Sequence, residues 1–230
     1  MQEAGGVTGT GRAYSSFLFE AVPDVVNLIK FHVQETGTKR GRRRPEIQVV
    51  TRSAIVLVCA YWEAFCEDLA AEALLHLADY APDAKGVPHA VQRTLIRNLN
   101  DSKNDLTTWA LAGDGWRTAL RDRAKLISGD MDRSLNTPKS YQVREFFKIN
   151  VGIGDITQSW SWHKNPPART TDLLDEFVTL RGRIAHRGST GSPVYKQRAL
   201  RSLNFVMRLA ERSAVCTSLH LEAHTGKQLE

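Results

Sequence analysis

The 230-residue sequence has little of what marks secreted, membrane and metal-binding proteins. Its three cysteines, Cys59, Cys66 and Cys216, are too few for a disulfide framework, and their apolar surroundings are unlike a zinc site. The start lacks the basic and apolar regions of a signal peptide, and the longest apolar run, residues 54–61, is far shorter than the ~20 residues that cross a bilayer. We therefore expect a cytoplasmic protein in a reducing compartment, without a membrane partner.

Several catalytic and cofactor-binding motifs are also missing. No serine lies in a nucleophile elbow and no lysine stands in a Walker motif, which argues against elbow hydrolases and P-loop enzymes. Gly152-Ile-Gly154 lacks the third glycine and the preceding strand of a dinucleotide fingerprint, so we interpret it as a turn. His220 and His224 are spaced like a metal pair but have no obvious third ligand, which favours incidental surface histidines and no metal site.

Helical periodicity is what the chain does have. No alternating strand pattern and no internal repeat occur, so we predict an all-α bundle with two long helices and several shorter ones. The long helices are expected over 46–80, which has no glycine or proline, and over 193–223. The shorter helices are expected over 15–33 with a break at Pro23, 88–99, 105–111, 114–127, 140–150 and from Thr170 or Thr171 onward. We expect one domain over 15–223, with flexible ends at 1–14 and 224–230.

Positive charge is concentrated in clusters. The formal net charge is +6, which alone favours an anionic partner only weakly. One dense run before Pro45 contains Lys39, Arg40, Arg42, Arg43 and Arg44. Such a run is either a solvated loop or an arm that contacts phosphates, and the sequence leaves both interpretations open.

The segment 173–187 organises the functional prediction. Its apolar stripe faces a core and consists of Leu173, Phe177, Leu180 and Ile184. On the same helix Arg181 lies at the flank of the stripe, whereas His186 lies nearly opposite it. We therefore expect His186 to be exposed near the end of the helix, with Gly188 as its C-cap.

The long helix over 46–80 carries an acid among aromatic residues. The stretch Tyr61-Trp-Glu-Ala-Phe65 puts Glu63 where a carboxylate is costly unless it is paired or opens onto a polar cleft. A salt-bridged or exposed acid at the edge of a helix and a functional acid are both consistent with this pattern.

Together these stretches resemble the HEPN superfamily, and its RiboL-PSP type in particular. Residues 180–187 match the Arg-x4-to-6-His motif, and residues 60–69 are similar to the early helix of the RiboL-PSP type. Asn136-Thr-Pro138, Phe146-Phe147 and residues 152–156 agree in the right order, so the resemblance covers about 15–223. It implies a helical bundle, in many members a metal-independent ribonuclease of toxin–antitoxin, RNA-processing or anti-phage systems.

The resemblance also implies roles for individual residues in cutting RNA by attack of its own 2′-hydroxyl, without a cofactor. His186 would act as base or acid, Arg181 would hold the scissile phosphate, and Glu63 would orient Arg181 or position RNA. RNA contacts are expected from Arg183, Arg187 and the cations of 39–44. Pairing of two motif helices across a two-fold axis would form a homodimer with a composite cleft. An antitoxin or another defence-system partner is also expected.

One departure and two other function classes stay open. Active members often carry a polar residue after the motif arginine, where this chain has Gly182. Glycine either leaves room for the RNA backbone or is compensated by Arg183. The alternatives to a nuclease are a catalytically inactive HEPN scaffold for RNA or protein, and a helical bundle that binds a nucleotide or another small molecule.

Overall fold

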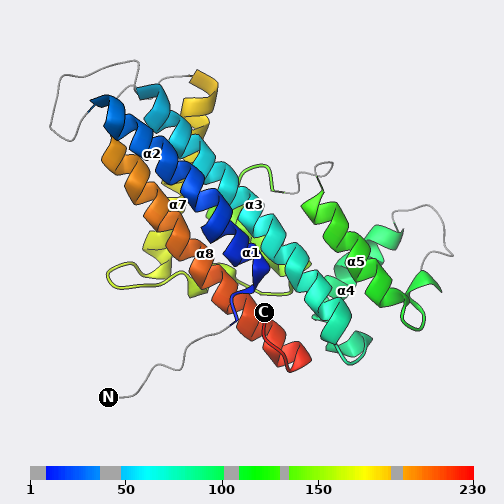
Figure 1. The fold of residues 1–230 in the computed structure, drawn as a ribbon. Helices are drawn as coiled ribbons and strands as arrows, with labels where there is room; N and C mark the ends of the chain where they lie inside the picture. The colour runs from blue at the N-terminus through cyan, green and yellow to red at the C-terminus, as the bar shows by residue number, and fades with distance from the viewer. Residues whose placement is uncertain (1–8, 37–47, 101–108, 130–134, 188–193) are drawn as a thin grey trace.

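A computed structural model describes residues 9–36, 48–100, 109–129, 135–187 and 194–230 of the chain (Figure 1). Over these ranges the protein is helical and has no strand, only an isolated bridge between Trp162 and Asn165. The predicted all-α class is therefore confirmed. The cationic run Lys39–Arg44 and the proposed cap Gly188 lie outside the described residues.

Two long helices and several shorter ones make the bundle. The long helices are α3 (Gln48–Tyr80) and α8 (Lys196–Thr225), close to the predicted bounds. The other elements, in chain order, are α1 (Gly11–Ser16), the π-helical segment η1 (Phe17–Ala21), α2 (Val22–Thr36), η3 (Ala84–Gly86), α4 (His89–Asn100), α5 (Gly115–Ser128), α6 (Ser140–Asn150), η5 (Ile156–Ser159) and α7 (Pro167–Arg187).

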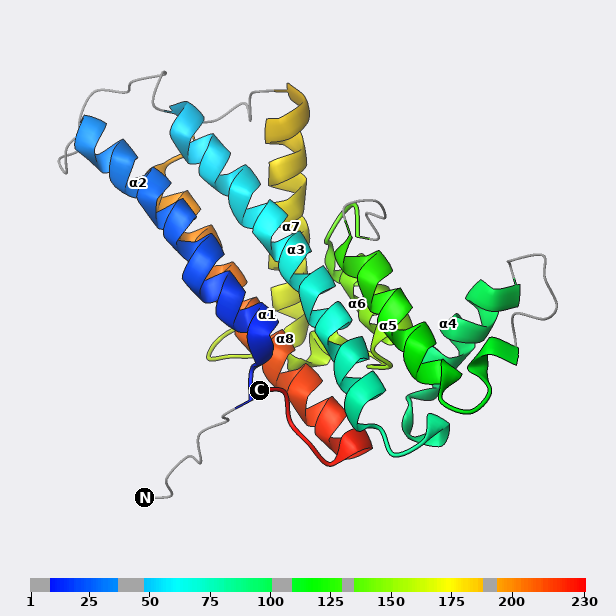
Figure 2. The same ribbon diagram turned by 45° about the vertical axis from the view of Figure 1, so that its right-hand side comes forward.

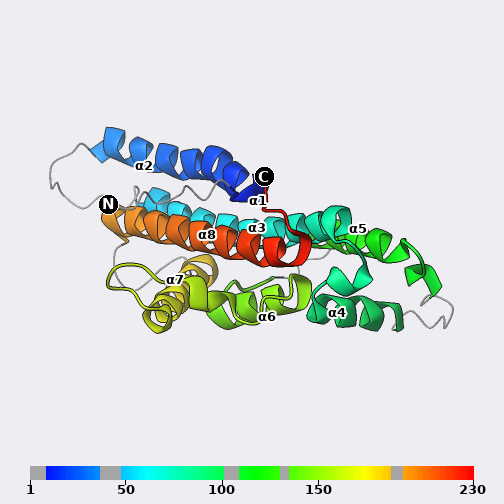
Figure 3. The same cartoon turned by 90° about the horizontal axis from the view of Figure 1, so that it is seen from below.

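The helices form layers around α3, which contacts α1, α2, α5, α6, α7 and α8. Seen from below, α1 and α2 cover one side of the α3–α8 layer, and α4, α6 and α7 cover the other (Figure 3). In the rotated view α7 runs to the right of the first half of α3 and crosses behind its middle (Figure 2). The antiparallel run of α3 and α7 brings the middle of α3 beside the second half of α7.

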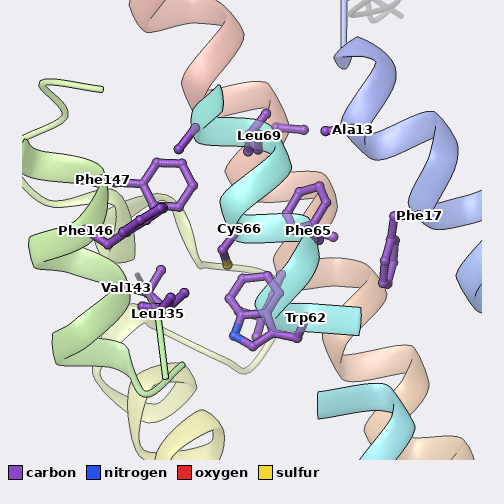
Figure 4. Packing of buried hydrophobic residues seen from close by; sticks show 14 of the residues in the cluster. Ala13, Phe17, Trp62, Phe65, Cys66, Leu69, Leu135, Val143, Phe146 and Phe147 are labelled. Carbon is purple, nitrogen blue, oxygen red and sulfur yellow. The ribbon is translucent and has the colours of Figure 1, made fainter. Parts of the chain in front are cut away.

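The core is centred on the aromatic stretch of α3. Trp62 is fully buried, stacks on Phe65 with ring centroids 5.8 Å apart, and meets Trp160 edge-on at 5.9 Å. Both indoles are satisfied inside the protein, because Trp62 Nε1 donates to the Pro138 carbonyl and Trp160 Nε1 donates to Ser213 Oγ. Figure 4 shows the core residues of α3 packed between those of α1 and η1 on one side and those of α6 on the other.

By length and apolar composition α3 would be able to cross a membrane. Within the described residues it serves as a core helix, because apolar side chains are buried on several of its faces. A central helix of a bundle passes the same length and hydropathy criteria as a membrane span.

The break expected at Pro23 takes the form of a π-helical segment just before it. Proline has no N–H to donate and its ring crowds the preceding turn. In η1 the chain widens by one residue, and the Val22 N–H donates to the Phe17 carbonyl instead. Helix α1 starts earlier than predicted because Glu72 of α3 accepts hydrogen bonds from the backbone N–H groups of Arg12 and Ala13.

The expected flexible ends need correction. Helix α1 begins at Gly11, inside the segment expected to be flexible. At the other end Leu229 is buried at 2% exposure, and its N–H donates to Ser218 Oγ at 3.1 Å. An added Cβ at Gly9 would meet the Leu229 carbonyl, so the described part of the N-terminal segment packs on the C-terminal one. Because neither contact follows a helical period, sequence patterning gave no signal for either.

Two further expectations are wrong. Where a helix was expected over 105–111, most of which is not described, Trp109 opens a short 3-10 turn and is 75% exposed. Helix α7 starts at Pro167 rather than at a threonine cap. Proline suits the first position of a helix because the N–H that it lacks would have no partner there.

Leu229→Ala is expected to lower the free energy of unfolding by about 2 kcal/mol, because it removes a buried side chain that ties the C-terminal segment to α8. Urea denaturation measures the effect. The control is Glu230→Ala, which changes the exposed next residue and is expected to stay within about 0.5 kcal/mol of wild type. Equal stability of both variants would show that the C-terminal segment does not pack.

Candidate functional site

Helix α7 is fixed to the bundle by one apolar face. Phe177, Leu180 and Ile184 are buried as predicted, while Leu173 is half-buried and Leu174 beside it is fully buried. This burial sets the rotation of the helix about its axis, so the directions of the polar motif residues follow from it.

The ion pair between Arg181 of α7 and Glu63 of α3 is the first feature of the site. Arg181 Nη2 lies 3.7 Å from Glu63 Oε2, and the two side chains are 28% and 16% exposed. A partly shielded pair has a stronger electrostatic attraction than one in open water. Of the two interpretations of Glu63 left open by the sequence, a salt-bridged acid fits the structure, and its partner is the motif arginine.

The guanidinium of Arg181 retains hydrogen-bonding capacity. Its Nε is buried and finds no acceptor among the described residues. A buried donor without a partner is unfavourable by about 1–3 kcal/mol, and such groups are often found where a ligand binds. The pair therefore orients Arg181 without using all of its donors.

The thiol beside this pair is not reactive. Burial raises the pKa of Cys59 to about 12. The positive charge of Arg181 acts against this shift, and the negative charge of Glu63 adds to it. Burial also raises the pKa of Cys66 and of Cys216. Because the thiolate is the nucleophilic form of cysteine, none of the three offers nucleophilic or base chemistry at neutral pH.

His186 is exposed near the C-terminal end of α7, as the helical wheel predicts. It lies about 140° around the axis from Arg181 and about 7.5 Å further along it. The helix surface between them is formed by Gly182 and Ala185, which are both small. An extended ligand can therefore run over this strip between the guanidinium and the imidazole.

The structure favours one of the two explanations for Gly182. An added Cβ at Gly182 would meet nothing within 4 Å, so the position faces open space. Arg183 is exposed but lies about 160° around the helix from Arg181, on the side away from the strip. Gly182 thus leaves room beside the motif arginine, and Arg183 is poorly placed to supply the missing polar group.

An apolar groove of about 580 Å³ adjoins the strip. It runs between α2, α3 and the end of α7, and its lining comprises Leu28, Val49, Arg52, Ser53, Val56, Leu57, Ala60, Ile184 and Ala185. Arg52 brings a cation to this groove and was missed by sequence reasoning. It is an isolated cation between Thr51 and Ser53 at the start of α3, outside any motif, and only the antiparallel contact with α7 brings it near the site.

The expected RNA-contacting residues divide into three groups. Arg183 is described and exposed. Arg187 belongs to the last turn of α7, but its side chain is not described. Lys39, Arg40, Arg42, Arg43 and Arg44 lie in the undescribed segment 37–47, so their contribution stays a prediction.

His220 and His224 are structural tethers rather than incidental surface histidines. His220 Nε2 lies 3.1 Å from the Val151 carbonyl, and His224 Nδ1 lies 2.9 Å from the Gly86 carbonyl. Burial, together with the neighbouring His224, lowers the pKa of His220, which favours the neutral ring. In the described part of the chain, no three His, Cys, Asp or Glu residues gather as a possible metal site.

Comparison with known protein families bears on these residues directly. The model of the RiboL-PSP-HEPN family matches residues 20–214, which include Glu63, Arg181 and His186. The chain belongs to the RiboL-PSP-HEPN family. No curated protein and no solved structure gave a match.

Membership of the RiboL-PSP-HEPN family accounts for the bundle. The matched region extends from η1 into α8, so it contains both helices that carry the ion pair. The resemblance inferred from residues 60–69 and 180–187 is thereby confirmed at the level of the family. The roles of individual residues stay predictions.

Gly182→Ala is expected to raise the free energy of unfolding by about 0.5–1 kcal/mol, because alanine is the better helix former and its methyl group enters open space. Urea denaturation measures the change. Gly152→Ala is the matched control and should destabilise the protein, since Gly152 has φ +89° and its added Cβ would meet Pro88. A loss of stability in Gly182→Ala would mean that the space beside Arg181 is filled.

Proposed function

We propose that this protein is a metal-independent endoribonuclease of the HEPN type. The observation that carries the proposal is the placement of a partly shielded, acid-paired Arg181 and an exposed His186 at two edges of an open strip on one helix. Guanidinium and imidazole are the groups needed to cleave RNA, because the substrate brings its own nucleophile, the 2′-hydroxyl.

Arg181 acts on the scissile phosphate. A guanidinium binds phosphate oxygens through a planar fork of donors and stabilises charge that builds up as the phosphorus becomes five-coordinate. Glu63 lies beside one end of the fork, 3.7 Å from Nη2, which restricts the rotation of the side chain. Glu63 is thus a positioning residue.

His186 moves protons. As the 2′-oxygen attacks phosphorus, an imidazole removes the hydroxyl proton; the bond to the 5′-oxygen breaks, and that oxygen must receive a proton. The products are a 2′,3′-cyclic phosphate and a 5′-hydroxyl. One imidazole does not readily serve as base and acid in the same step, and each copy of the chain presents a single His186.

Two copies of the chain therefore build the cleft in this proposal. Their α7 helices pair across a two-fold axis, so that the two His186 rings and the two Arg181 guanidinium groups face one substrate. Within one copy the strip separates Arg181 from His186 by about 140° around the axis and about 7.5 Å along it, so the second imidazole that the step requires comes from the partner copy.

The apolar groove supports the same pairing. It adjoins the strip, and Val49 at its rim is 55% exposed. Phe31 of α2, which lines a second hollow with Leu28 and Leu57, is 51% exposed. Large apolar side chains gathered beside a functional site are typical of an interaction surface. A bacterial conflict or stress setting and an antitoxin partner stay predictions from the family resemblance.

His186→Ala is expected to reduce the rate of RNA cleavage about 10²- to 10⁴-fold, because it removes the proton-transfer group. Arg181→Ala is expected to reduce it by about 10²-fold or more, through lost charge stabilisation. The assay follows cleavage of a structured RNA in the presence of EDTA. Glu63→Gln keeps the shape of the side chain and should give a smaller loss than Arg181→Ala.

The matched control is His89→Ala, an exposed histidine on α4, which should cleave like wild type. Activity that survives His186→Ala would remove the imidazole from the mechanism. A wild-type protein that binds RNA but leaves it intact under all conditions would favour the scaffold alternative instead.

Val49→Asp is expected to convert the dimer to a monomer and to abolish cleavage, because it places a charge at the apolar rim of the groove. Analytical ultracentrifugation measures the mass in solution. Leu126→Asp is the control, since Leu126 on α5 is 53% exposed and away from the groove, and it should stay dimeric. A wild-type protein that is monomeric yet active would contradict the composite cleft.

A further inference from the structure

The outward face of α8 carries a row of arginines. Arg201, Arg208 and Arg212 are exposed and lie within about 40° of one another around the helix, and Arg198 lies about 40° to one side. The row extends about 21 Å along the axis. None of the four forms an ion pair with another described residue.

The cations of α5, by contrast, have partners within the fold. On α5, Arg121 pairs with Asp79 at 2.7 Å, and Lys125 pairs with Asp122 at 3.3 Å. Arg117 donates to the carbonyls of Ala78 and Ala81 and so caps the end of α3. The arginines of α8 have no acidic or carbonyl partner of this kind among the described residues, and Arg208 lies instead over the ring of Trp162.

An aromatic side chain lies beside the row. Trp162 is half-buried, packs edge-on against Phe205 of α8 with centroids 5.9 Å apart, and has the Arg208 guanidinium carbon 5.9 Å from its ring centroid. The bridge between Trp162 and Asn165 closes a short turn that presents Lys164, which is exposed. The turn and α8 thus join an indole ring to the basic row.

The row starts at the same end of the bundle as the candidate cleft. The Val194 carbonyl, just before α8, accepts a hydrogen bond of 2.8 Å from Thr51 Oγ1 at the start of α3. The next residue, Arg52, lines the groove together with Ile184 of α7. From there α8 runs back along the bundle, so the row leads away from the cleft (Figure 1).

We propose that this face of α8, defined by Arg198, Arg201, Arg208 and Arg212 with Trp162, binds single-stranded RNA that extends from the cleft. The arginines bind backbone phosphates, and Trp162 stacks on a base. The inference rests on the proposed function in that it takes RNA as the ligand. It differs in location, because none of these residues belongs to the motif helix or to the cationic run 39–44.

The chemistry of the face favours nucleic acid over an acidic protein segment. Unpaired cations along a line, with an aromatic ring among them, are typical of surfaces that bind a single strand by phosphate contacts and base stacking. The one acid in this part of α8, Glu211, is offset by about 60° around the helix from Arg208, and after burial it is the second cause that raises the pKa of Tyr14 of α1. The row itself, formed by Arg198, Arg201, Arg208 and Arg212, contains no acid.

The test compares two triple variants in a His186→Ala background, which keeps the RNA intact. The first is Arg201→Gln with Arg208→Gln and Arg212→Gln. The matched control is Lys85→Gln with Arg93→Gln and Arg97→Gln, which removes the same charge from exposed, unpaired residues of η3 and α4. Fluorescence anisotropy follows binding of an unstructured 12-nucleotide RNA between 50 and 200 mM salt, roughly the range over which phosphate contacts change affinity strongly.

The α8 variant should bind RNA at least about tenfold more weakly than its parent. The slope of its log K against log salt concentration should be shallower by about 2, as expected for three lost phosphate contacts on a single strand. The control should stay within about twofold of its parent. Trp162→Ala should weaken binding about fivefold, and Trp162→Phe should restore most of it. Circular dichroism melting verifies that each variant is folded.

The outcomes separate the two proposals. If the wild type cleaves RNA but the α8 variant binds RNA with the affinity and salt dependence of the control, the proposed RNA-binding role of α8 is wrong. The proposed ribonuclease activity is then unaffected. If the wild type does not cleave RNA, and RNA binding is lost in the α8 variant but not in the control, α8 binds RNA and the proposed ribonuclease activity is wrong. If the parent protein does not bind the RNA, the proposal that this face of α8 is an RNA-binding surface is wrong.

Discussion

The Arg181–Glu63 pair is the interaction around which the functional end of this protein is arranged. It joins α7 to α3 at a point where both side chains are partly shielded, with Nη2 and Oε2 3.7 Å apart. A guanidinium in such a place needs a counter-charge, because desolvation without one is unfavourable. The acid meets that need and leaves other donors of Arg181 for a further anion.

The core fixes the positions of the two partners. Trp62, next to Glu63, is locked by its bond to Pro138 and its contact with Trp160, so the rotation of α3 is set. Helix α7 is set in the same way by the burial of Leu180 and its neighbours. The side chains that remain outside, His186 above all, owe their direction to this packing.

Periodicity predicted the helices well where burial alone decides them. The long α3 and the bounds of α6 followed from apolar spacing, and so did the exposure of His186, since angles around one helix need no tertiary information. Features made by contacts between distant segments were not predictable in this way. The burial of Leu229 and the approach of Arg52 to α7 both depend on how helices meet.

The same distinction applies to charge. The sequence indicated a basic protein, but the spacing of cations on α5 and on α8 looks alike until their partners are seen. Arg121 of α5 is satisfied by Asp79, an acid far away in the sequence, whereas Arg208 of α8 has no acid partner in the described part of the chain and lies over the ring of Trp162. Sequence reasoning placed RNA contacts where cations are dense, and the structure adds a face where they are unpaired.

The central claim, that two copies share one cleft with both His186 rings, is tested most directly by mixing. Wild-type and His186→Ala chains carrying different tags are unfolded together, refolded at a 1:1 ratio and assayed for RNA cleavage. If both imidazoles are needed in one cleft, only dimers with two wild-type chains cleave, and activity falls to about one quarter of that of the all-wild-type sample. Activity of one half, in proportion to the wild-type chains, would contradict the shared cleft.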